Sequence, residues 1–223
     1  MGAKQEAQEW AEAVGRYGER HGLAYEEVGG INPKDGPVAL CVGGVNRLTG
    51  QLTEGFWGSS CDADEREVGG IFGKAVLPTA VLAKAHMPDL AKVVPAFNVE
   101  SVEGHEAVAQ RLSRKVEFES IDFNKRFWTT VPSDFDPVKL RELFGPGFLA
   151  WVTAMTGEID FGVNDRQLWF LWRLRERSEA ELKTALANAG QLFKRLQSEM
   201  DESGIHTYPP GPWHAGLEPF PDG

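Results

Sequence analysis

The feature that most constrains this chain is a run of five apolar residues at 168–172, followed by the pattern of a long amphipathic helix. Apolar side chains at consecutive strand positions point to both faces of a sheet, so the run predicts a central strand that is covered on both faces. Ser178 and Glu181 form a capping box, which indicates that a helix begins there. The connection at 175–178 is short, so we expect the helix and the strand to lie side by side.

The predicted C-terminal helix spans residues 179–202 and carries an apolar stripe along one face. The stripe consists of Leu182, Ala185, Leu186, Ala189, Phe193, Leu196 and Met200. The opposite, solvent-facing side is expected to carry Glu181, Lys183, Lys194 and Glu199. Such a helix could meet a partner chain, as in a dimer, but the neighbouring central strand favours packing on the sheet.

The first hundred residues predict one helix and then β-structure. Apolar residues recur on one face of the segment 3–21, and Gly22 is placed to end that helix. Residues 23–100 form a glycine-rich β region with apolar runs at 38–42 and 77–85. The pentapeptide Glu-Val-Gly-Gly-Ile occurs twice there, and we interpret it as coincidence in a glycine-rich sheet, although duplication stays open.

The second half of the chain predicts more strands and an interrupted helix. A β-pattern covers residues 115–131, but its buried face changes parity, so we expect a bulge or break within 116–121. Asp136 and Pro137 are typical of a helix start, and Gly-Pro-Gly at 145–147 interrupts the helix. Residues 158–175 predict a hairpin that turns at Asn164-Asp165.

Strands in this order cluster instead of alternating with helices, which predicts the α+β class with a mainly antiparallel sheet. We expect an N-terminal helix, a mid-chain helix and a long C-terminal helix packed on that sheet. The domain organisation predicted is a single α+β domain over 1–205, with a β-α-β-β-α order in 115–203. Residues 206–223 are rich in proline and glycine and predict an irregular tail.

Charge and hydropathy narrow the classes of partner. Acidic residues outnumber basic ones by 33 to 23, giving a net charge of −10 that opposes binding to nucleic acid. No apolar run reaches the roughly 20 residues of a membrane-spanning helix, and no secretory signal is visible, so we expect a soluble, cytoplasmic protein without a direct membrane span. We expect Cys41, in an apolar run, and Cys61, in a polar loop, to be reduced thiols.

Several acidic clusters suggest metal or acid–base chemistry, and each has a simpler interpretation. The sequence Asp-Ala-Asp-Glu at 62–65 is interpreted as a solvated turn, and Asp134-Phe135-Asp136 as a helix cap. Glu117, Glu119 and Asp122 are candidates for a pair of catalytic carboxylates, but a solvated strand face is the preferred explanation. Arg173, Arg175 and Arg177 are interpreted as a charged strand end.

The five histidines show no metal-ligand spacing, and the sequence contains no P-loop and no nucleophile elbow. We therefore predict no catalytic residue, no metal and no cofactor, and we lean against an enzyme.

The segment from Glu119 onward resembles a family of uncharacterised bacterial proteins of unknown function. The family pattern is a Glu-Ser-x-x-Phe-Asn-x-x-Phe strand followed by a helix that contains tryptophan. The matching residues are the segment 119–127, Leu140, Leu143, Phe144 and the segment 148–152. Members are often tethered to membranes, and the resemblance implies no known reaction or cofactor.

Within this pattern, Glu119, Ser120 and Asn124 are the candidates for ligand binding. The alternative is that Ser120 and Asn124 satisfy backbone groups at the break in the strand, and this alternative is preferred.

The best sequence-based hypothesis is a non-catalytic binding or scaffold domain with an unknown protein or small-molecule partner. A small-molecule or lipid-binding domain with a pocket between sheet and helices is the second hypothesis. A hydrolase that uses the carboxylates near Glu119 is the third. The sequence leaves the oligomeric state open.

Overall fold

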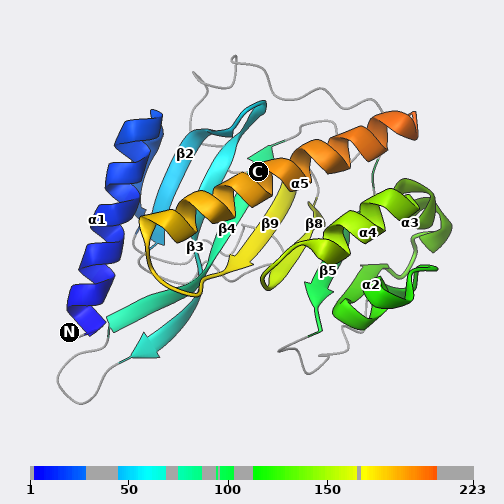
Figure 1. The fold of residues 1–223 in the computed structure, drawn as a ribbon, viewed down its shortest axis with the longest axis horizontal. Helices are drawn as coiled ribbons and strands as arrows, with labels where there is room; N and C mark the ends of the chain where they lie inside the picture. The colour runs from blue at the N-terminus through cyan, green and yellow to red at the C-terminus, as the bar shows by residue number, and fades with distance from the viewer. Residues whose placement is uncertain are drawn as a thin grey trace.

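The computed structural model describes residues 3–28, 45–68, 75–86, 94, 96–102, 113–164 and 167–204. Its described strands form one nine-stranded sheet in the order β1-β2-β3-β4-β9-β8-β5-β7-β6 (Figure 1). Neighbouring strands are antiparallel throughout this order, which confirms the predicted α+β class and the mainly antiparallel sheet. The strands are β1 (Ala24–Val28), β2 (Val45–Thr53), β3 (Phe56–Val68), β4 (Ala75–His86), β5 (Phe97–Ser101), β6 (Ser113–Val116), β7 (Phe127–Pro132), β8 (Ile159–Asn164) and β9 (Gln167–Arg173). The helices are α1 (Ala3–His21), α2 (Ile121–Arg126), α3 (Pro137–Leu143), α4 (Pro146–Ala154) and α5 (Glu179–Glu202).

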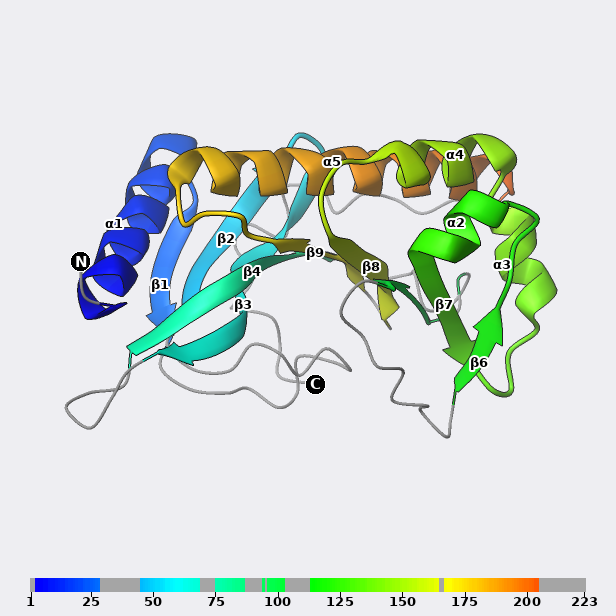
Figure 2. The same ribbon diagram turned by 60° about the horizontal axis from the view of Figure 1, so that its bottom comes forward.

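The helices gather on one face of the sheet, as Figure 2 shows for α1, α4 and α5. Helix α1 contacts β1, β2 and β4, and α5 crosses β2, β4 and β9. The first helix buries Trp10, Val14 and Tyr17 against the strands, and Gly22 follows it with a φ of 65° that favours glycine. We call this side of the sheet the helix face and the opposite side the second face.

Helix α5 spans Glu179–Glu202, as predicted from the sequence. Every residue of its predicted apolar stripe is buried. The Ser178 hydroxyl accepts the backbone N–H of Glu181, as the capping box predicts. The prediction that Glu199 faces solvent is wrong, because its side chain lies 6% exposed beside the start of α4. The Arg195 guanidinium lies 2.9 Å from the Glu199 carboxylate, so the buried negative charge of Glu199 is paired with a positive one.

Strand β9 lies at the centre of the sheet and is buried on both faces, as predicted. Its Phe170 and Trp172 belong to the main core under the helices. On the second face a smaller buried cluster comprises Cys61, Ala80, Leu82, Trp169 and Leu171. The prediction that Cys61 lies in a polar loop is therefore wrong, because it belongs to β3 and packs against this cluster. Its sulfur is not part of a disulfide in the described part of the chain.

The predicted break in the segment 115–131 is confirmed, and it is larger than a bulge. Strand β6 ends at Val116, and the helix α2 is inserted before β7 begins at Phe127. Ile121 is 69% exposed, and it is the first residue of α2. Phe123, two residues later, fills the core instead.

The helical segment after β7 divides as expected. Asp136 caps α3 by accepting the backbone N–H of Val138, and Gly145 precedes the separate helix α4. Phenylalanine rings from α2, α3–α4, β5, β7 and β8 pack here with centroids 4.6–6.5 Å apart, a spacing typical of favourable aromatic pairs. This part of the interface between sheet and helices is filled by aromatic side chains.

Several predictions fall outside the described residues: the strand at 38–42, Cys41, the glycine pairs, the turn residue Asp165 and the tail at 206–223. Among the helices that the structure does describe, none has the length and apolar character needed to cross a membrane.

Candidate functional site

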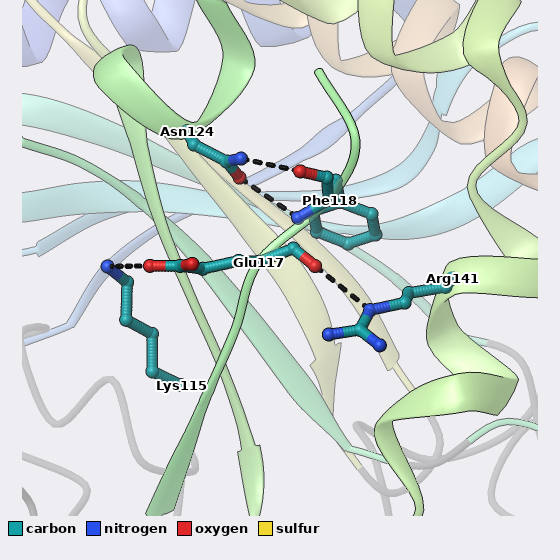
Figure 3. A network of polar contacts seen from close by, with 5 residues as sticks. All are labelled: Lys115, Glu117, Phe118, Asn124 and Arg141. Atoms are coloured by element: carbon teal, nitrogen blue, oxygen red, sulfur yellow. Dashed lines mark hydrogen bonds and ion pairs between the residues drawn. The ribbon is translucent and has the colours of Figure 1, made fainter. Parts of the chain in front are cut away.

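The segment from the end of β6 through α2 holds the residues that the sequence singled out, and Ser120 and Asn124 there bond backbone groups of the fold. The Ser120 hydroxyl accepts the backbone N–H of Phe123 at 3.3 Å and caps α2. The Asn124 amide donates to the Phe118 carbonyl at 2.6 Å and accepts the Phe118 N–H at 3.1 Å (Figure 3). The alternative explanation for Ser120 and Asn124, satisfaction of backbone groups, is confirmed. Ligand binding by Glu119, Ser120 and Asn124 stays a prediction.

The three acidic residues of this segment do not form a paired-carboxylate site on a strand. Strand β6 ends before Glu117, so the expected strand face shared by Glu117 and Glu119 is absent from this segment. Glu117 lies 2.7 Å from the Lys115 ammonium, while its carbonyl accepts the Arg141 guanidinium (Figure 3). The hydrogen bond and the charge of Lys115 hold the pKa of Glu117 below its ordinary value. Glu119 and Asp122 are exposed.

Arg126, within the matched pattern, has a structural role that sequence reasoning missed. Its guanidinium donates to the carbonyls of Thr153 and Met155 at 2.5 Å and of Gly157 at 2.7 Å. These carbonyls lie in the last turn of α4 and just after it, where a helix leaves its last acceptors without backbone partners. Arg126 therefore joins α2 to the C-terminal end of α4.

Asp62 is a buried carboxyl group, although sequence reasoning placed it in a solvated turn. It lies on β3, only 2% exposed, and α1 covers it. The Trp10 indole N–H donates to Oδ1 at 2.9 Å, and the Asn46 amide donates to Oδ2 at 2.7 Å. Tyr25 in turn donates its hydroxyl to Asn46. The lack of Gly, Pro and Asn in residues 59–68 was the signal for a continuous strand.

Burial raises the pKa of the Asp62 carboxyl to about 6. The hydrogen bonds from Trp10 and Asn46 and the positive charge of Arg177 act in the opposite direction and only partly offset burial. Both oxygens accept donors of the protein itself, so this carboxylate is built into the contact between α1 and the sheet.

Two of the three arginines near the end of β9 pair with carboxylates of the same chain. Arg173 lies 3.3 Å from Asp160, a buried residue of β8. Arg177 lies 2.5 Å from Glu6 of α1, and Arg175 is exposed. These pairs support the interpretation of a charged strand end. No group of three or more His, Cys, Asp or Glu side chains with a metal-binding arrangement occurs in the described part of the chain.

Comparison with known proteins yields a likeness in fold. No family model matches the sequence, and no curated protein matches it. The structure is similar to the crystal structure of the mycobacterial trehalose monomycolate transport factor A, TtfA, with a TM-score of 0.54. The match covers 89% of this chain and 96% of that chain at 13% sequence identity. At this identity the comparison shows a shared α+β fold.

Proposed function

We propose that this chain is a non-catalytic binding domain that acts as an accessory factor in a transport process. The observation that carries the proposal is that the polar groups of the candidate segment are engaged in the fold or exposed. Ser120 and Asn124 bond backbone groups, and the pKa of Glu117 is lowered, whereas a general acid or base working near neutral pH needs a raised one. Asp62 has a raised pKa but lies under α1 with both oxygens occupied.

The role in transport is an analogy from the fold. Folds host many functions, so the likeness to a transport factor only favours this role over catalysis. The resemblance of the segment 119–152 to uncharacterised bacterial proteins stays a prediction, as does a cytoplasmic location. The aromatic rings that pack between sheet and helices give no support to a lipid pocket at that place.

The test compares the wild-type chain with a triple variant, Glu117→Gln, Glu119→Gln and Asp122→Asn. Both proteins are screened by melting temperature against sugars, sugar phosphates, nucleotides and short-chain phospholipids, and each probe is recovered for mass spectrometry. We expect at least one probe to raise the melting temperature of both proteins equally and to be recovered unchanged.

Conversion of a probe by the wild type and not by the triple variant would show a carboxylate enzyme and overturn the proposal. A panel without any stabilising probe would also count against ligand binding.

A further inference from the structure

The carboxyl group of Asp62 is enclosed between a single helix, α1, and the sheet. Its residue is 2% exposed on β3, and the Trp10 indole of α1 donates to Oδ1 at 2.9 Å. The Asn46 amide of β2 donates to Oδ2 at 2.7 Å. The helix therefore supplies one hydrogen bond to the carboxyl and also keeps water from it. Lifting α1 would break that hydrogen bond and let water solvate the carboxyl group.

The groups around this carboxyl compensate only part of a negative charge. Among the described side chains, Arg177 is the cation that acts on it, and Arg177 also pairs with Glu6 of α1 at 2.5 Å. Tyr25 and the exposed Glu27 of β1 lie on the same face of the sheet, and the apolar Val81 of β4 is the register partner on the other side. Burial therefore outweighs these contacts and raises the pKa of the carboxyl to about 6.

Helix α1 lies at one end of the sheet, beside the edge strand β1 and far from α2, α3 and β7 (Figure 2). It contacts β1, β2, β4 and α5, and ion pairs join its Glu6 to Arg177 and its Arg20 to Glu179. The aromatic cluster of α2, α3–α4, β5, β7 and β8 is built from residues outside α1. That cluster can stay packed while α1 moves, which is the condition for an opening that costs less than global unfolding.

We propose that α1 is a pH-dependent cover of the sheet, which lifts as a unit more often as the pH rises from about 4 to about 7. The ionised Asp62 carboxylate is solvated when α1 is lifted and enclosed when α1 is closed, so the open form holds fewer protons and ionisation favours it. Opening exposes the apolar side of α1 together with Leu48 of β2, against which Gly18 of α1 packs closely. The inference goes beyond the proposed function, because it concerns a movement of the fold and needs no ligand.

The test is hydrogen–deuterium exchange of the full chain, followed by mass spectrometry of peptides from α1 and from α5 at several pH values. Exchange rates are corrected for the intrinsic effect of pH on amide exchange. We expect α1 to open at least about tenfold more often than α5 at pH 7. The opening constant of wild-type α1 should rise about 50-fold between pH 4 and pH 7, the change that a carboxyl shifted from 3.8 to about 6 produces.

Two variants identify the group responsible. In Asp62→Asn the opening constant of α1 should stay nearly constant over the same range, because the side chain no longer titrates. Asp122→Asn, at an exposed position on α2, should keep the wild-type pH dependence. A pH dependence that persists in Asp62→Asn overturns the proposal, and so does a wild-type α1 whose opening ignores pH.

A second measurement on the wild type decides the matter even if Asp62→Asn does not fold. Small amounts of urea promote an opening in proportion to the surface that it exposes. Exchange in α1 should therefore respond less steeply to urea than exchange in α5, because lifting one helix exposes less surface than global unfolding. Equal slopes and equal opening constants in α1 and α5 would mean that α1 leaves the sheet only when the whole protein unfolds, which overturns the proposal.

Discussion

The buried carboxyl group of Asp62 should make the stability of this protein depend on pH in a definite direction. Its pKa rises from 3.8 to about 6 on folding, mainly through burial. The folded state therefore keeps a proton that the unfolded chain has already released between these two values. The free energy of unfolding contributed by this group is fully present below pH 3.8, falls as the pH rises through the window and levels off above about pH 6.

The magnitude follows from the size of the shift. About two pKa units correspond to about 3 kcal/mol, and solvent screening removes little of this because the side chain is 2% exposed. Asp62→Asn removes the titration. The wild type should therefore lose about 3 kcal/mol relative to Asp62→Asn between about pH 4 and about pH 7.

The assay is urea unfolding followed by tryptophan fluorescence at a series of pH values, with wild type and variant measured side by side. Other titrating groups cancel in the difference, and Asp122→Asn, at an exposed position on α2, serves as the matched control with a flat difference. Trp10→Phe removes one donor to the carboxylate and should extend the window to higher pH. A difference that grows in the opposite direction, or that stays within about 0.5 kcal/mol, would refute the reasoning.

Three further substitutions test the packing. Leu186→Ala, in the buried stripe of α5, should lower the free energy of unfolding by about 2–5 kcal/mol in urea titrations, with exposed Lys183→Ala near zero. Gly190→Ala places a Cβ 2.7 Å from Thr53 and should lower the free energy of unfolding by about 1–3 kcal/mol. Helix propensity alone predicts the opposite, a gain in stability. A melting temperature above that of the wild type would therefore contradict the prediction. Arg126→Met leaves three carbonyls without their donor and should cost about 2–3 kcal/mol, against a negligible change for Lys125→Met in the same assay.

Local patterns predicted most of the helices and the central strand. Asp136 and Ser178 cap their helices as their spacing indicated, and the stripe of α5 is buried along its whole length. These features depend on residues within one or two turns of each other, so they can be read from a short window of sequence. The parity change before α2 likewise predicted a break, although it did not reveal that a helix fills it.

Tertiary structure alone decided the pairing of β4 with β9 and of β5 with β8. These strands are far apart in the chain, and no local pattern states which of them become neighbours. The first pairing brings Lys84 beside Trp169, and the second brings Asn98 beside Gly162.

The same limit applies to the carboxyl groups. The sequence predicted a solvated turn at Asp62 because a carboxylate is ordinarily exposed. In the fold, α1 covers Asp62 and supplies the Trp10 N–H, which lies 52 residues away in the chain. Whether a carboxyl group is solvated or buried thus depends on the packing of distant segments. For this reason the sequence alone determined most of the helices and the central strand, whereas the tertiary structure decided the burial and the pKa of Asp62.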